Sequence, residues 1–330
     1  MQKIKFLIFY APLLLLIACS TPGETTPTEQ PPTPLAVEPT IAPPEATLPP
    51  TVAPTEPAEA YPPPAPTTNA YPAPTQNPLA YPAPLDTTPV AVSFPSADGT
   101  LLTGTYYPPR TGPVPIVVLM HQFGSDQHQW DEIAVWLQTG TPPAGNEWLP
   151  QMAPGMTFAV LTFDFRGHGE SEGNAGDDAG LLMDAQSAVA FGKTQLGADP
   201  LRVITIGTSI GADGAVDACI KLNEGDIAET QEYQGCLGAM ALSPGNFLGV
   251  NYTRAATAFV GDPHFSALYC LAAENDSSAP LLCNSLSGNR YKAVIYPGNA
   301  HGMSLLKAGF DPNVGDVILE FLLESLQLRQ

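Results

Sequence analysis

A serine enclosed by two glycines is the strongest candidate for covalent chemistry in this chain. Ser209 lies at the centre of Gly207-Thr208-Ser209-Ile210-Gly211, which has the form G-x-S-x-G. A serine hydroxyl in this setting can attack a carbonyl carbon and form an acyl-enzyme. A chain with 29 glycines also produces such patterns by chance, so an ordinary loop serine is the alternative. The elements on either side of the pattern must decide between the two.

Nucleophilic chemistry at a serine also requires a base and an orienting acid, because the hydroxyl alone is a weak nucleophile. The chain has five histidines, at positions 121, 128, 168, 264 and 301. His301 follows the last apolar run, in a loop with glycine and asparagine neighbours, and is the candidate for the base. A solvent-exposed loop histidine without a catalytic role is the alternative. No cluster of His, Cys and carboxylates has metal-ligand spacing, and no G-x-G-x-x-G follows a strand-like run. We therefore expect no metal and no cofactor.

Apolar runs of strand length recur along the C-terminal part of the chain. They are nearly uninterrupted, which is typical of parallel strands that are buried on both faces. Segments with helical periodicity lie between several of them and near the C-terminus. The runs are residues 116–120, 158–163, 203–206, 237–242, 267–271 and 293–296, and the helical segments are 130–137, 182–189, 212–219 and 314–322. This alternation predicts an α/β fold, preceded by an antiparallel hairpin of residues 90–96 and 101–107.

Ser209 falls where one of these apolar runs meets a helical segment, which is the position of a nucleophile on a sharp turn. Side chains on either side of the serine would crowd such a turn, and this explains the flanking glycines. The N-terminus of the helix would favour negative charge that develops near the hydroxyl. In the helix itself, we expect Ala212 and Ala215 on one face and Asp213 and Asp217 on the other.

Four motifs, in order from about residue 92 to the end, resemble those of the α/β-hydrolase superfamily. VVLMHQFGS, residues 117–125, resembles the strand and oxyanion loop with its H-G-x-G pattern. FDFRGHGES, residues 163–171, resembles the D-x-R-G-x-G-x-S stretch, and G-x-S-x-G is the third motif. The fourth is an acid in a loop after a strand, followed by a histidine near the C-terminus. The resemblance implies an α/β-hydrolase fold with a mostly parallel central sheet and helices on both faces. The sequence contains no long helical insertion, so we expect no separate lid domain.

The catalytic residues of this superfamily follow the order serine, acid, histidine. The resemblance therefore implies a triad of Ser209, Asp276 and His301. Asp276 fits the family pattern G-x-x-D-x-x-x-P, although an alanine replaces the glycine. Glu274 and Asp262 are the rival acids.

The resemblance also implies an oxyanion hole, formed by the backbone N–H groups of Ile210 and Phe123. Gln122 departs from the family pattern, which has glycine at this position. If the backbone required a positive φ there, glutamine would be costly, so the path of the loop is open. Gln122 could instead offer a side-chain donor, and we assign it to substrate binding. His121 and His168 lie in two of the motifs and are implied to hold loops.

The N-terminus has the pattern of a secretory signal. Lys3 and Lys5 precede an apolar run, residues 6–18, that is too short for a stable membrane span. It ends in Leu-Ile-Ala-Cys, which resembles the lipobox of bacterial lipoproteins. We predict that residues 1–18 are a lipoprotein signal peptide and that Cys19 carries lipid, which attaches the protein to the membrane in the cell envelope, outside the cytoplasm. An ordinary signal peptide with a chance cysteine is the alternative.

Residues 19–89 have the composition of a disordered spacer. Residues 20–90 contain 22 of the 38 prolines and neither Lys nor Arg, and Ala-Tyr-Pro-x-Pro repeats at Tyr61, Tyr71 and Tyr81. Such a segment cannot bury enough apolar surface to fold, and its prolines keep it extended. A recognition motif for a partner is the alternative. The Thr-Pro content also allows O-glycosylation, and cell-envelope glycans are candidate partners.

The folded domain, residues 90–330, is acidic. It carries 25 acidic and 10 basic side chains, and so has a formal charge of −15. No basic cluster is present, which argues against nucleic acid and against electrostatic docking to anionic lipid.

Four cysteines lie in this domain, and an even number in an oxidising compartment suggests two disulfides. We predict Cys219–Cys236 and Cys270–Cys283, each closing a short loop, the second around Asp276. Cys236–Cys270 is the main alternative, since their strands should be neighbours. These two cysteines, however, lie at opposite ends of those strands, which should hold them too far apart.

Together these features predict a membrane-attached serine hydrolase that cleaves a small-molecule carboxylic ester. A peptidase or acyltransferase with the same triad is one alternative, and a non-catalytic lipid-anchored binding protein is another. Loops that leave the C-terminal ends of parallel strands surround the site in such sheets. We therefore expect substrate selection by residues 122–130, 166–180, 243–266 and 302–312, and expect the segments 140–157 and 223–235 at the opposite edge.

Overall fold

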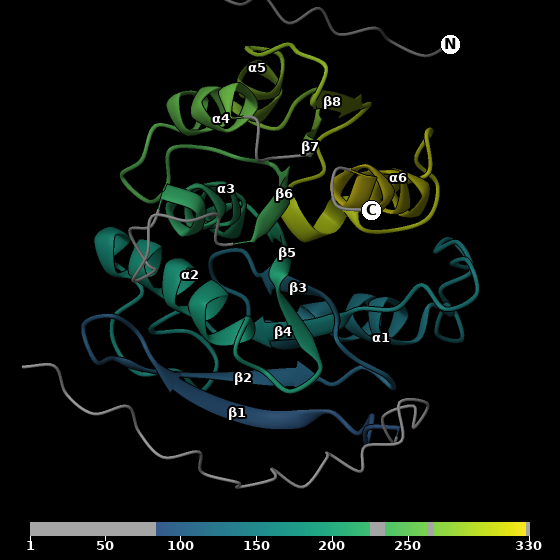
Figure 1. Ribbon diagram of the computed structural model, residues 1–330. Coiled ribbons are helices and arrows are strands. Elements are labelled where there is room, and N and C mark those ends of the chain that lie inside the picture. The colour runs from purple at the N-terminus through teal and green to yellow at the C-terminus, as the bar shows by residue number, and fades with distance from the viewer. Residues whose placement is uncertain (1–83, 225–234, 263–266, 328–330) are drawn as a thin grey trace, which may run out of the picture. The chain divides into compact units, whose positions relative to one another are not determined.

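The computed structural model describes residues 84–224, 235–262 and 267–327, which all belong to the compact unit Pro74–Gln330. The predicted signal peptide, Cys19 and most of the spacer lie outside the described residues, as does most of the segment 223–235. The described strands form one eight-stranded sheet in the order β1-β2-β4-β3-β5-β6-β7-β8 (Figure 1). The strands are β1 Val90–Pro95, β2 Leu101–Tyr107, β3 Val114–Met120, β4 Ala159–Phe163, β5 Ala198–Thr208, β6 Cys236–Leu242, β7 Ala267–Ala273 and β8 Tyr291–Tyr296.

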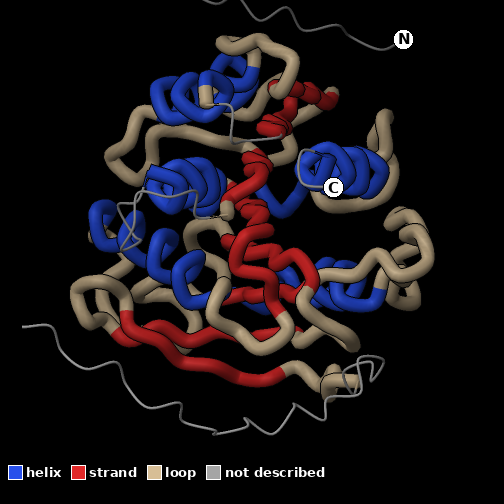
Figure 2. The backbone as a smooth tube through the Cα atoms, viewed as in Figure 1, coloured by secondary structure: helices blue, strands red, loops and turns tan. Residues whose placement is uncertain are grey.

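Helices cover both faces of this sheet, as Figures 1 and 2 show. Helices α2, α3, α4 and α5 share one apolar core with the sheet, and α1 and α6 share the core on the other face. No helix in the described ranges is long and apolar enough to cross a membrane. The helices are η1 Gln127–Trp130, α1 Asp131–Thr139, α2 Asp178–Gly192, α3 Ile210–Glu224, α4 Tyr252–Gly261, α5 Ala279–Cys283, η2 Gly302–Leu305 and α6 Val314–Gln327.

The strand directions confirm the predicted sheet. Strands β3 to β8 run parallel, and β1 and β2 form the antiparallel hairpin that joins the sheet beside β4. All residues of β4, β6 and β7 are buried, because helices lie on both sides, and this explains their uninterrupted apolar sequences. The short helices α4 and α5 were not predicted. A single turn such as α5 is too short to show helical periodicity.

Helix α3 is buried on nearly all sides, including the side that carries Asp213 and Asp217. Asp213 and Asp217 are only 1% and 7% exposed. The helix lies against the sheet and also packs between α2 and α4. Gly214 permits this packing, since a Cβ atom there would lie 2.9 Å from the Cβ of Ala185 in α2.

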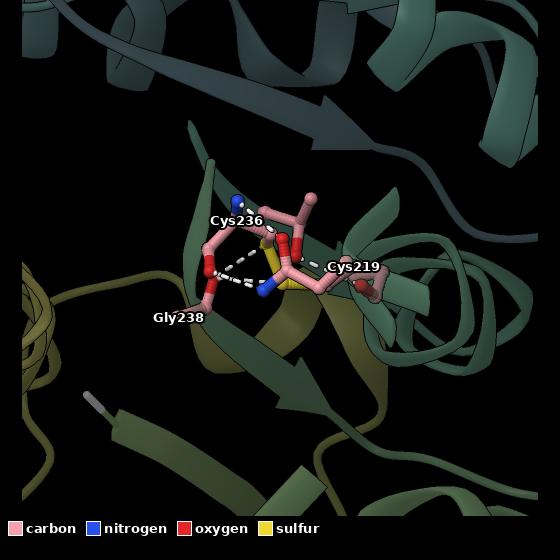
Figure 3. Close-up of a disulfide and its surroundings, with 6 residues drawn as sticks. Cys219, Cys236 and Gly238 are labelled. Atoms are coloured by element: carbon pink, nitrogen blue, oxygen red, sulfur yellow. Dashed lines mark hydrogen bonds between the residues drawn. A yellow bond between two sulfur atoms is a disulfide. The ribbon is translucent and has the colours of Figure 1, made fainter. Parts of the chain in front are cut away.

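Two disulfides join the pairs of cysteines that we predicted. Cys219 of α3 is bonded to Cys236 at the start of β6 (Figure 3), and Cys270 of β7 is bonded to Cys283 of α5. The Cα atoms are 5.4 and 5.3 Å apart. In the register of β6 and β7, Cys270 lies opposite Ala241, five residues along β6 from Cys236. At about 3.3 Å per residue, this separation excludes the alternative pair.

The Cys270–Cys283 bridge encloses Asp276, the predicted catalytic acid. We expect the Cys270→Ala/Cys283→Ala double variant to lose more turnover than Cys219→Ala/Cys236→Ala, because only the first bridge restrains the loop of the acid. Both should lower the free energy of unfolding, by about 3 kcal/mol each on the loop-entropy model. Turnover measured well below both unfolding temperatures separates the two effects. Equal turnover in the two double variants would contradict the restraint.

Candidate active site

Ser209 lies on a sharp turn between β5 and α3. Its φ is +53°, in the left-handed region that residues other than glycine rarely adopt. A Cβ atom at Gly207 would overlap the carbonyl group of Gly211, and one at Gly211 would overlap the carbonyl oxygen of Met120. The two glycines are therefore required by space, as predicted. The turn holds Ser209 in a strained conformation, which is typical of functional sites.

His301 and Asp276 are joined by a hydrogen bond. The Nδ1–H of His301 donates to Oδ1 of Asp276 over 2.7 Å. Asp276 is 5% exposed, whereas the His301 side chain is 43% exposed and so remains accessible. Of the rival acids, Glu274 is exposed and Asp262 ends α4. The structure therefore brings Asp276, and neither rival, to the histidine.

The loop of His301 passes beside the turn that carries Ser209. Gly302 has φ +53°, and a Cβ atom there would lie 3.5 Å from the Cβ of Thr208, the residue before Ser209. Ser209 and His301 are both described, and Oγ of Ser209 forms no hydrogen bond to His301. Such bonds are often long in the absence of substrate. The bond between His301 and Asp276 is thus formed, and the contact between Ser209 and His301 stays a prediction.

Two side chains from other loops hold the backbone that follows His301. Oγ of Ser243 accepts a hydrogen bond from the N–H of Gly302 over 2.8 Å. Oε1 of Gln122 accepts one from the N–H of Met303 over 2.9 Å. These two bonds therefore join the loops after β3, β6 and β8 next to His301. Ser243 was missed by sequence reasoning, although a polar residue at the end of an apolar strand is a signal for it.

We expect Gln122→Leu to lower kcat by about ten- to a hundredfold with little change in KM, because a histidine misplaced by about 1 Å costs that much. Gln122→Glu keeps an acceptor oxygen for the N–H of Met303 but has no side-chain donor. It should retain most of the activity if Gln122 positions His301. If Gln122 instead donates to substrate, as predicted from the sequence, Gln122→Glu should fail with a raised KM. Steady-state kinetics of the two variants separate these roles.

The predicted oxyanion donors lie at the edge of the sheet where the parallel strands end, which is also the edge that carries Ser209. Ile210 is the first residue of α3, and Phe123 lies in the turn after β3, the strand beside β5. Within the described residues, neither N–H donates a hydrogen bond. Gln122 is not among the described non-glycine residues with positive φ, so its side chain does not strain this loop. The N–H groups are free for an oxyanion, and that role stays a prediction.

All three described non-glycine residues with positive φ are serines at this edge of the sheet. Ser209, Ser243 and Ser277 have φ of 53°, 56° and 44°. They follow β5, β6 and β7, and Ser277 comes directly after Asp276. Backbone strain of this kind persists only where the surrounding structure imposes it. Its concentration here agrees with the prediction that the site lies at this edge.

His121 braces the loop that precedes Phe123. Its Nδ1–H donates to the carbonyl oxygen of Gln122 over 2.7 Å, and its Nε2 accepts from the N–H of Phe165 over 3.0 Å. Both ring nitrogens are therefore used by a neutral imidazole. Complete burial lowers the pKa of His121 from 6.5 to about 4. The implied structural role of His121 agrees with these contacts.

This lowered pKa predicts a loss of stability in acid. Below pH 6.5 His121 becomes protonated in the unfolded chain, whereas in the folded chain it stays neutral down to about pH 4. Unfolding is therefore favoured as the pH falls through this window, by an amount on the order of 3 kcal/mol. Burial also raises the pKa of Asp213 from 3.8 to about 6, and this has the opposite sign, because folding then favours the protonated acid.

A His121→Gln variant isolates the histidine. Its free energy of unfolding should fall less between pH 6.5 and 4 than that of the parent, since the Asp213 contribution is common to both. Denaturant titrations at several pH values measure the difference. Parallel pH profiles for the two proteins would contradict the prediction.

The D-x-R-G stretch forms a network that holds loops. Asp164 accepts the N–H of Gln127 over 2.7 Å, and Arg166 makes a bidentate pair with Asp184 over 3.0 and 2.8 Å. The same guanidinium reaches Asp98 and Asp177. Arg166 is only 3% exposed, and its partners raise its pKa further. These contacts consume its donors and support a bracing role.

Asp213, one turn after Ser209, holds the loop that follows β6. Its two carboxylate oxygens accept the N–H groups of Gly245 and Phe247 over 2.9 and 2.7 Å. Because the acid is buried, these bonds fix the loop relative to the first turn of α3. No group of three or more His, Cys, Asp or Glu in the described part of the chain could hold a metal ion.

Comparison with solved structures decides the fold. The protein DcsB, solved in complex with its substrate analogue, aligns with a TM-score of 0.51 and 14% identity over 73% of this chain and 100% of its own. A hyperthermophilic esterase from Pyrobaculum calidifontis aligns at 0.50 and 16% over 74% and 85%. The α/β hydrolase GrgF from Penicillium sp. sh18 aligns at 0.50 and 15% over 71% and 97%. The described chain has the α/β-hydrolase fold. Within the described residues, the connection between β6 and β7 contains helix α4, and no separate lid is present.

Sequence comparison finds proteins that are similar to part of this chain. YfhR of Escherichia coli K12, described as an uncharacterized protein, is 33% identical over 129 residues, 38% of this chain and 40% of its own length. The protein Rv2307c of Mycobacterium tuberculosis H37Rv is 30% identical over 125 residues, 38% of each. The chain thus spans about two fifths of the length of these relatives. No protein-family model matches the chain.

Proposed function

We propose that this protein is a serine hydrolase that cleaves carboxylic esters. The observation that carries the proposal is the hydrogen bond of 2.7 Å between His301 and the buried Asp276, at the edge of the sheet where Ser209 occupies its strained turn. An acid that orients a histidine beside a serine is the arrangement that activates the hydroxyl. The α/β-hydrolase fold is compatible with this chemistry but does not by itself specify it.

In the proposed mechanism, Nε2 of His301 takes the proton of Ser209 as Oγ attacks the ester carbonyl carbon. Asp276 keeps the Nδ1–H of the ring directed toward itself, which leaves Nε2 free to act as the base, and it stabilises the imidazolium. The N–H groups of Ile210 and Phe123 would bind the oxyanion. His301 then protonates the leaving alcohol. Water, activated by the same nitrogen, attacks the acyl-enzyme and regenerates Ser209.

We further propose that the enzyme acts outside the cytoplasm, attached to membrane lipid through Cys19. The two disulfides support an oxidising compartment. The signal-like residues 1–18 and Cys19 support lipid attachment. Incorporation of labelled fatty acid into the full chain, lost in Cys19→Ala, tests it.

A fluorophosphonate probe tests the proposed function directly. We expect one label per chain, on the peptide that contains Ser209, and its absence after Ser209→Ala. A panel of p-nitrophenyl esters, aminoacyl amides and acyl acceptors then separates ester hydrolysis from peptidase and acyltransferase activity. An unlabelled protein that retains its fold would favour a non-catalytic binding role.

A further inference from the structure

Two exposed phenylalanines lie on either side of Ser209. Phe123 is 57% exposed and Phe247 is 40% exposed, whereas every other phenylalanine in the described ranges is buried or half-buried. Phe123 follows β3 and Phe247 follows β6, and these strands are the two neighbours of β5 in the sheet (Figure 1). In the register of the parallel strands, Met120, Gly207 and Ala241 are level. The loops with the two phenylalanines therefore flank the turn of the nucleophile.

Both aromatic rings pack against neighbouring groups, and the backbone at Phe247 is hydrogen-bonded. The N–H of Phe247 donates to Asp213 over 2.7 Å, and a Cβ atom at Gly245 would overlap the Phe247 ring, so the ring lies over its own loop. The ring of Phe123 meets the ring of His168 edge-on, with 5.0 Å between centroids. Exposed side chains that are held in this way lose little conformational entropy when a ligand covers them.

We infer that Phe123 and Phe247 bind the acyl group of the substrate, and that the preferred substrates are uncharged esters with an apolar acyl chain of several carbons. The inference rests on the proposed ester hydrolysis. The acyl group stays on Ser209 in the acyl-enzyme after the alcohol has left, and the turn of Ser209 lies between the two loops with the phenylalanines. Covering two exposed rings with alkyl groups removes apolar surface from water on both partners. The formal charge of −15 disfavours an anionic acyl group.

Esters that share one leaving group test this inference. We expect kcat/KM to rise by about tenfold or more from p-nitrophenyl acetate to the hexanoate, since a fully buried methylene contributes up to about fourfold. Phe247→Ala should remove at least about fivefold on the hexanoate and change the rate on the acetate less than twofold. Phe247→Leu should restore most of the loss. Each ester is used below the concentration at which it forms micelles.

Leu196→Ala is the matched control, because Leu196 is 75% exposed and lies between α2 and β5, at the opposite edge of the sheet. It should leave the dependence on chain length unchanged. A flat dependence in the parent, or an equal loss on acetate and hexanoate in Phe247→Ala, would overturn the inference while Ser209-dependent cleavage of the acetate still upheld the proposed function. Failure to cleave any ester would overturn both.

Discussion

Replacement of Ser209 by alanine is expected to lower kcat/KM for ester hydrolysis by at least about 10³-fold. The variant loses the oxygen atom that attacks the carbonyl carbon. No other serine in the described residues lies on this turn between β5 and α3, so none can replace it as the nucleophile. The fold should survive, because the backbone N–H of Ser209, not its hydroxyl, donates to Leu242, over 2.9 Å. Steady-state kinetics and thermal unfolding of the same preparation measure both effects.

Ser285→Ala is the control for this substitution. Ser285 is an exposed serine after α5, and its replacement should leave both turnover and the unfolding temperature nearly unchanged. Near-parental rates for Ser209→Ala on several esters would end the assignment of Ser209 as the nucleophile. A large drop in unfolding temperature would instead show that the turn itself depends on the hydroxyl.

The strands and the nucleophile turn could be predicted from sequence because local chemistry fixes them. Strand β6 is buried on both faces, so every residue in it is small or apolar. Gly207 and Gly211 face backbone atoms that leave no space for a side chain. For the cysteines, strand geometry excluded one alternative, because Cys270 lies level with Ala241, five residues along β6 from Cys236. The short loops favoured the two pairs that form.

Contacts between distant loops could not be predicted in this way. The bond between Gln122 and Met303 joins residues 181 positions apart, and the bond between Ser243 and Gly302 joins residues 59 apart. Neither is visible until the strands are ordered in the sheet. The sequence placed Asp213 on the polar side of its helix, and a charged side chain there normally faces water. The N–H groups that satisfy it come from a loop 32 and 34 residues later.

The orienting role of Asp276 predicts a second large effect. Asp276→Asn should lower kcat by about 10⁴-fold, because an amide NH₂ toward Nδ1 favours the tautomer with its proton on Nε2, which cannot accept the proton of Ser209. The size of the side chain is preserved, so the loop enclosed by Cys270 and Cys283 should keep its conformation. Glu274→Gln is the matched control, two residues away and exposed.

The rate of fluorophosphonate labelling separates an orienting acid from a structural one. If Asp276 orients the base, labelling of Ser209 should slow in parallel with kcat, while KM and the unfolding temperature change little. If Asp276 only stabilises the loop, the unfolding temperature should fall and the remaining folded protein should label at the parental rate. Equal losses in Asp276→Asn and Glu274→Gln would contradict the assignment, because the bond of 2.7 Å to His301 is made by Asp276 and not by Glu274.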